Sequence, residues 1–154
     1  MNMITILKDI IQPLFVIIVG IFALYQYQKQ QKFKRLQNLS ALWKTFLNDE
    51  KLLDLFNLLN LAENKDPEII ENIRNYDQKW KYKYLAMIEE VTLYVDTFEI
   101  DKPQAKYLFQ WHFYFAYQSP DTVEGFWSNL GGAEEMNASY WAKSRNLSKA
   151  FLPS

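Results

Sequence analysis

His112 is the single histidine of the chain and lies in an aromatic run, while Glu89 and Glu90 lie on the predicted preceding helix. A carboxylate that orients an imidazole ring is an arrangement used in general-base catalysis. No nucleophile or substrate pocket accompanies it in the sequence, and a lone histidine among aromatic residues is more often a core residue with one hydrogen bond. We therefore predict a buried polar role for His112 and assign no catalytic residue.

Glu89 and Glu90 lie between Ile88 and Val91, so at least one carboxylate must lie near an apolar helix face. A partly buried glutamate of this kind can act as a proton or conformational switch. The alternative is an ion pair with a lysine or a hydrogen bond from a tyrosine hydroxyl. We favour the alternative, and keep both residues as candidate buried polar groups.

No metal or cofactor site is expected from the sequence. One histidine cannot supply the two Glu-x-x-His pairs of a di-iron bundle, and the absence of cysteine removes thiolate zinc ligands, disulfides and a thiol nucleophile. Gly131-Gly132 lacks the spacing and the lysine of a phosphate loop, so this pair is predicted to end a helix in the left-handed conformation.

Charge is divided unevenly along the chain. Residues 1–48 carry six basic residues and one acidic residue, a net of +5, so the total of −1 leaves −6 for residues 49–154. An acidic body argues against a nucleic-acid partner. Lys79, Lys81 and Lys83 alternate with aromatic residues, but residues two apart on a helix point in different directions. We predict the solvated start of a helix there.

The segment Ile10–Tyr27 contains eighteen residues without a charge. As a helix it is about 27 Å long, close to the roughly 30 Å of a bilayer's hydrocarbon core. A cleaved signal peptide and a buried core helix are the alternatives. The first fits less well because the basic residues follow the apolar stretch and no A-x-A site is present. The second fits less well because Leu14–Leu24 is apolar around its whole circumference.

The basic residues predict the orientation of this span. They crowd on its C-terminal side, so the domain that follows is expected in the cytoplasm, with the N-terminus outside and a single pass through the inner membrane. Anionic lipid headgroups are the expected partners of Lys29, Lys32, Lys34 and Arg35, which we call the basic collar. The membrane-interface candidates are Tyr25, Tyr27, Lys29, Lys32, Lys34 and Arg35.

The rest of the chain predicts an all-α fold, because apolar residues recur at helical spacing throughout. The transmembrane helix is expected to continue into a small cytoplasmic helical bundle. We divide the chain into a transmembrane anchor (1–28), a basic juxtamembrane helix (29–48) and a cytoplasmic helical domain (49–154). Helix starts are predicted at Asn48 or Asp49 and at Asp66, where a side chain can cap the first turn, and after Asp101 and Ser119. A long core helix is predicted over about 77–98. A last helix is predicted over 137–151.

Aromatic residues make up 17% of the chain, more than a core of this size requires. Some rings are therefore candidates for an exposed docking surface, with ordinary core packing as the alternative. The candidates are Trp127, Tyr140 and Trp141, because they flank a polar, turn-rich stretch.

One uncharged span, a basic continuation and the stretch KYLAMIEEVTLYVDTFEIDKPQAKYLFQWHFYF together resemble a family of bacterial single-span membrane proteins with a small α-helical cytoplasmic domain. The resemblance implies a fold and a topology, and it carries over no catalytic residue. Some such proteins resemble accessory parts of bacterial stress or antiphage defence modules, which implies a setting.

Three functions follow as expectations. The first is a membrane-anchored, non-enzymatic adaptor or scaffold whose helical domain binds a protein partner or another copy of itself. The second is an oligomeric membrane effector that perturbs the bilayer when triggered, assembling through Gly20 and Gln12. The third is an enzyme that uses Glu89, Glu90 and His112, which requires an activity lost in a folded His112→Ala protein.

Overall fold

The structure is a computed structural model that describes residues 3–97, 99–120 and 122–151. All regular structure in these segments is helical, so the all-α prediction is confirmed, with a long apolar N-terminal helix followed by a helical domain. The chain divides into two compact units, Met1–Gln37 and Asn38–Ser154. The second unit begins within the segment that the sequence assigns to the juxtamembrane helix.

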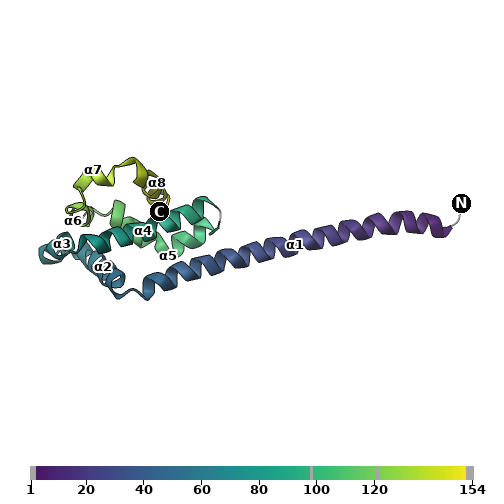
Figure 1. Cartoon of the computed structure of the whole chain (residues 1–154), viewed down its shortest axis with the longest axis horizontal. Coiled ribbons are helices and arrows are strands. Elements are labelled where there is room, and N and C mark those ends of the chain that lie inside the picture. The colour runs from purple at the N-terminus through teal and green to yellow at the C-terminus, as the bar shows by residue number, and fades with distance from the viewer. Residues whose placement is uncertain (1–2, 98, 121, 152–154) are drawn as a thin grey trace. The chain divides into compact units, whose positions relative to one another are not determined.

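The first helix, α1, runs without interruption over Met3–Leu47 and contains Pro13 (Figure 1). Seven further α-helices follow among the described residues. They are α2 (Glu50–Leu61), α3 (Pro67–Arg74), α4 (Gln78–Asp96), α5 (Lys102–Tyr117), α6 (Val123–Trp127), α7 (Gly132–Met136) and α8 (Ala142–Phe151), with short 3-10 turns at Ala62–Asn64 and Ser139–Trp141.

Three aspartates begin three of these helices as the sequence predicts. The Asp49 carboxylate accepts from the backbone N–H of Leu52, at 3.2 Å, and begins α2. Asp66 begins α3 and Asp77 begins α4 in the same way, each accepting a backbone N–H at 2.9 Å. An N-cap carboxylate satisfies one of the free N–H groups of the first turn and interacts favourably with the helix dipole.

The core of the second unit forms around α5, which packs against α4, α2, α6 and α8. Figure 1 shows α4 and α5 side by side, with α8 beside them. The last turns of α1 belong to this unit and contribute Leu39, Leu42 and Phe46 to its core. Phenylalanine rings fill much of the interior, and those of α5 and α6 are fully buried: Phe109, Phe113, Phe115 and Phe126.

The C-terminal part differs in detail from the prediction. Gly131 and Gly132 do adopt positive φ, at 109° and 67°, but they begin an additional helix, α7, whereas α6 already ends at Trp127. The last helix begins at Ala142, five residues after the predicted start at Asn137. The intervening residues 137–141 contain the C-cap of α7, Asn137, and a 3-10 turn over Ser139–Trp141.

Candidate functional site

His112 is enclosed by aromatic rings in the core of the second unit. Its ring stacks on Phe56, at 4.2 Å between centroids, and lies edge-on to Phe46 at 4.5 Å. Its Nδ1 lies 2.8 Å from the Tyr84 hydroxyl. Burial lowers the pKa of His112 to about 3, because a charged imidazolium is poorly solvated there. The ring is therefore neutral at physiological pH.

Neither Glu89 nor Glu90 is the hydrogen-bond partner of His112, so the carboxylate-oriented imidazole is not formed. Glu89 is half-buried and accepts a hydrogen bond from the Ser144 hydroxyl of α8, whose oxygen is 2.9 Å from that of Thr92. Glu90 is exposed, and its charge raises the pKa of the Tyr94 hydroxyl. The two neighbouring carboxylates thus lie in different environments: Glu89 links α4 to α8, and Glu90 faces solvent.

Lys81 of α4 lies in the interior of the second unit. The residue is fully buried, whereas Lys79 and Lys83 are exposed, so the predicted solvated helix start is wrong for Lys81. Its ammonium donates to the backbone oxygens of Arg74 and Gly125, each at 3.2 Å, and to Asn129 Oδ1 at 2.7 Å. Among the described residues no carboxylate joins these three oxygens, and burial lowers the pKa of Lys81 to about 8.

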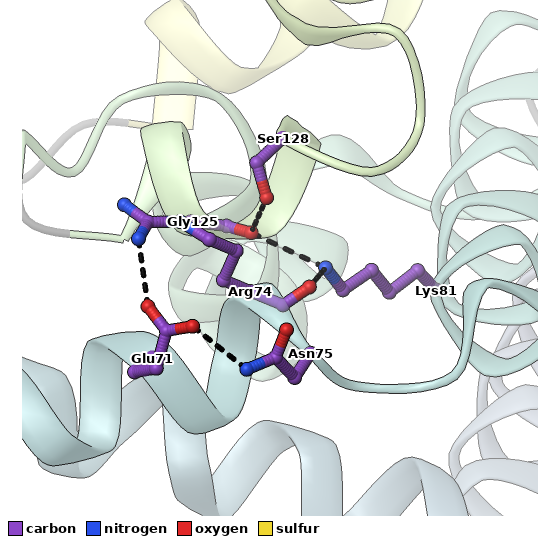
Figure 2. A network of polar contacts seen from close by, with 6 residues as sticks. All are labelled: Glu71, Arg74, Asn75, Lys81, Gly125 and Ser128. Atoms are coloured by element: carbon purple, nitrogen blue, oxygen red, sulfur yellow. Dashed lines mark hydrogen bonds and ion pairs between the residues drawn. The ribbon is translucent and has the colours of Figure 1, made fainter.

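The Lys81 ammonium joins segments that are distant in sequence. Figure 2 shows it pointing between the last residue of α3 and Gly125 of α6, whose carbonyl also accepts from the Ser128 hydroxyl. Asn129 adds a hydrogen bond from its side-chain amide to the Tyr76 carbonyl, at 3.0 Å. A lysine ammonium that donates all three of its protons to fixed oxygens acts as a structural cross-link between the segments that carry them.

The candidate docking rings are mostly core residues. Trp127 is 1% exposed and its indole N–H donates to the Ala116 carbonyl at 2.6 Å. Trp141 is 8% exposed and packs edge-on against Trp127. These two residues therefore cannot form an exposed surface, which corrects the expectation, because both pack into the core and against each other. Tyr140 remains exposed, at 58%.

Other aromatic residues are exposed on the helical unit. Tyr107 is 81% exposed and Trp111 is 44% exposed, and their spacing of four places both on one face of α5. The Trp111 ring is held from below by Tyr114 and Phe115, with centroids at 5.7 and 6.1 Å. This α5 pair forms an exposed aromatic surface on the second unit, and no pattern within the run indicates which of its rings face outward.

An open groove of about 480 Å³ lies beside the end of α5 and is lined mainly by Tyr117, Val123, Trp127, Ala133 and Met136. The Tyr117 hydroxyl and Ser119 Oγ are both buried, so neither atom is accessible at the groove surface. Burial and the nearby Glu89 raise the pKa of Tyr117. In the described segments, no group of three or more metal-binding side chains is assembled.

The apolar part of α1 is exposed on every side. Its large apolar and tyrosine side chains from Ile11 to Tyr27 are each 48% to 65% exposed. Within the described residues α1 is the helix that is long and apolar enough to cross a membrane, and none of its apolar stretch is buried by the protein itself. The buried core helix is therefore disfavoured as an explanation of this segment.

The basic residues that follow are also on the surface. Lys29, Lys32 and Lys34 are exposed and Arg35 is half-buried, while Tyr25 and Tyr27 are 61% and 60% exposed. The predicted interface residues thus follow directly on the apolar stretch of one continuous helix. Consecutive residues are about 1.5 Å apart along a helix, so residues 29–35 extend over about 9 Å, somewhat more than the roughly 5 to 8 Å of one headgroup layer.

Comparisons with known proteins return nothing for this chain. No family model, curated protein or solved structure matches it. The resemblance to single-span membrane proteins therefore stays a prediction.

Proposed function

We propose that this protein is a membrane-anchored interaction protein. The apolar part of α1 crosses the inner membrane, the basic collar binds anionic headgroups, and the helical unit binds a protein partner in the cytoplasm. The observation that carries the proposal is the exposure of the apolar side chains of α1, from 48% upward on all sides. In water that surface favours burial at about 25 cal/mol per Å², and a bilayer provides it.

The helical unit suits binding better than catalysis. Its buried ionisable groups, His112 and Lys81, are enclosed by rings or by carbonyl oxygens and do not open onto the groove. Its exposed aromatic pair, Tyr107 and Trp111, has the chemistry of a protein-binding anchor, because large rings supply contact area at low entropic cost. We place the partner-binding surface on this face of α5.

Insertion and orientation are tested with single cysteines, because the chain has none of its own. Full-length Asn2→Cys and Asn57→Cys proteins are expressed, and intact cells are treated with a membrane-impermeant maleimide. We expect labelling of residue 2 from outside and labelling of residue 57 only after lysis. A mature protein that has lost its N-terminus would support the signal peptide, and extraction by carbonate would contradict insertion.

A matched pair of substitutions tests the anchor itself. Ile18→Lys introduces a charge near the middle of the span, at a cost of about 3 kcal/mol, whereas Ile18→Val keeps the apolar surface. We expect the Ile18→Lys protein to shift from the membrane to the soluble fraction. The Ile18→Val protein should stay in the membrane fraction. Equal distribution of both variants would contradict the proposal.

The partner-binding surface is tested in crosslinked, detergent-extracted complexes of the full-length protein. Tyr107→Ala with Trp111→Ala should abolish the recovery of a specific partner. Tyr82→Ala with Tyr140→Ala, which removes two other exposed tyrosines, should leave it unchanged. If the α5 variant retains the same partner, the surface lies elsewhere on the unit.

A further inference from the structure

Within the first unit, α1 carries a continuous face of a composition unlike the rest of the helix. Eight positions follow one another at alternating spacings of four and three residues, which on a helix form one stripe. We call this stripe the glutamine seam; it consists of Gln12, Val16, Val19, Ala23, Gln26, Gln30, Phe33 and Gln37. Four of the six glutamines between residues 12 and 37 belong to it.

The opposite face of the apolar stretch is different. Helical geometry places the bulky side chains there, namely Leu14, Ile17, Ile18, Ile21 and Leu24. In the same stretch the seam holds valine, alanine and an amide. Interfaces between membrane helices favour small residues that permit close approach and polar residues that bond across, whereas lipid-facing surfaces are bulky and apolar. The asymmetry therefore indicates a helix-packing face.

The surface of α1 is hollowed along this stripe. One shallow hollow includes Gln12 and Val16, and another includes Gln26, Gln30, Phe33 and Gln37. Half of the residues that line each hollow belong to the seam, so the hollows overlap its two ends and leave space there for side chains of a second helix. The spacing of 3.5 residues predicts a left-handed crossing near 20°.

We propose that the occupant of the glutamine seam is the seam of a second copy of this chain, in parallel orientation. This inference rests on the proposed membrane anchor. Every copy carries the same distribution of basic residues, so all copies insert with one orientation and place Gln12 at the same depth. A carboxamide both donates and accepts, so two Gln12 side chains at one depth, near the outer end of the span, complete each other's hydrogen bonds.

The basic collar sets a condition on this pairing. Lys29 and Lys34 flank the seam at positions that face each other across a parallel pair, where like charges repel. Anionic headgroups at that depth neutralise them, at about 1 kcal/mol per basic residue. Self-association is therefore stronger in membranes with anionic lipid than in purely zwitterionic ones.

Disulfide crosslinking of the full-length protein tests the seam, since the chain has no competing cysteine. Val19→Cys and Ala23→Cys lie on it, and Ile18→Cys and Ile21→Cys are controls at nearly the same depth on the other face. Each protein is placed in vesicles of phosphatidylglycerol and phosphatidylethanolamine at low protein-to-lipid ratio and oxidised. We expect dimers from the seam variants and few from the controls.

The polar pair is tested by energy transfer between labelled copies in the same vesicles. Gln12→Leu should weaken self-association about threefold to twentyfold, the range measured for hydrogen bonds between membrane helices. Gln12→Asn keeps the amide and should restore most of it. Carbonate extraction of the same samples reports insertion separately.

The outcomes separate this inference from the proposed anchor. Protein that is extracted by carbonate overturns the anchor and the seam together. Inserted protein that stays monomeric, crosslinks equally on both faces, or associates as well with Gln12→Leu overturns the seam alone and leaves the anchor standing.

Discussion

The Tyr84 hydroxyl and His112 Nδ1 lie 2.8 Å apart in the interior of the helical unit and join α4 to α5. Both residues are within 1% of complete burial. Burial also raises the pKa of Tyr84 well above its usual value, so both partners remain neutral across the physiological range. A neutral hydrogen bond between two buried rings fixes the register of the helices without the desolvation cost of an ion pair.

Acid should destabilise this unit through His112. The folded protein holds the pKa of His112 at about 3, whereas the unfolded chain protonates it near its usual value of about 6.5. Between pH 6.5 and 3 the unfolded state therefore binds more protons than the folded state. The free energy of unfolding decreases by up to about 1.4 kcal/mol for each unit by which the pH is lowered through this range. Urea unfolding in detergent, followed by tryptophan fluorescence, measures it.

His112→Gln is the comparison for that pH series, because it removes the titrating group and keeps a polar side chain. The difference in stability between the two proteins should narrow as the pH falls below 6.5. A constant difference from pH 7 to 4 would show that His112 is protonated in the folded protein as well.

Removal of the Tyr84 hydroxyl should cost stability without loss of the fold. Tyr84→Phe leaves a buried imidazole nitrogen without its partner, which costs about 1–3 kcal/mol. Tyr82→Phe, two residues earlier and 44% exposed, should change the unfolding free energy by less than about 0.5 kcal/mol. The two thermal unfolding midpoints give the comparison, and equal midpoints would argue against a structural role for the bond.

Lys81→Met should be among the most damaging substitutions on the surface-facing start of α4. It leaves the carbonyls of Arg74 and Gly125 and the Asn129 amide oxygen without the donor they share, at a cost of about 2–4 kcal/mol. Lys79→Met is the matched control, because that lysine is exposed, and it should be nearly neutral. Denaturant unfolding of both proteins decides; similar values would mean that water replaces the ammonium.

The rings of the C-terminal segment should separate by burial. Trp127→Leu removes a fully buried indole together with its hydrogen bond to Ala116 and should cost about 3 kcal/mol or more. Tyr140→Leu acts on a side chain that is 58% exposed and should stay within about 0.5 kcal/mol. Their order in a thermal series tests the revised assignment of the docking candidates.

Local chemistry explains what the sequence predicted well. Asp49, Asp66 and Asp77 act on N–H groups two or three residues away, so their capping roles are legible without the fold. The apolar stretch of α1 is legible for the same reason. Lys81 is different, because its acceptors come from α3, α6 and the loop after α6, and no local pattern reports that three oxygens will converge on one amine.

The burial of Trp127 has a similar cause. The Ala116 carbonyl that accepts its hydrogen bond lies near the end of α5. The Trp141 ring, fourteen residues after Trp127, packs against the Trp127 indole. The turn-rich stretch between them looked exposed because of its composition, whereas the chain path brings both indoles inward. The α5 run shows the reverse, since Tyr107 and Trp111 face outward from a segment that composition alone assigns to the core.

The enclosure of the Lys81 amine makes it a built-in reporter of motion. An acylating reagent reacts with a lysine amine only when that amine is exposed to solvent and unprotonated. Lys79 and Lys83 are exposed, Lys83 in an ion pair with Asp49, while Lys81 becomes accessible only when the contact between α3 and α6 separates. The rate at which this one amine acquires a label, relative to its two neighbours on α4, therefore times the opening of that end of the unit.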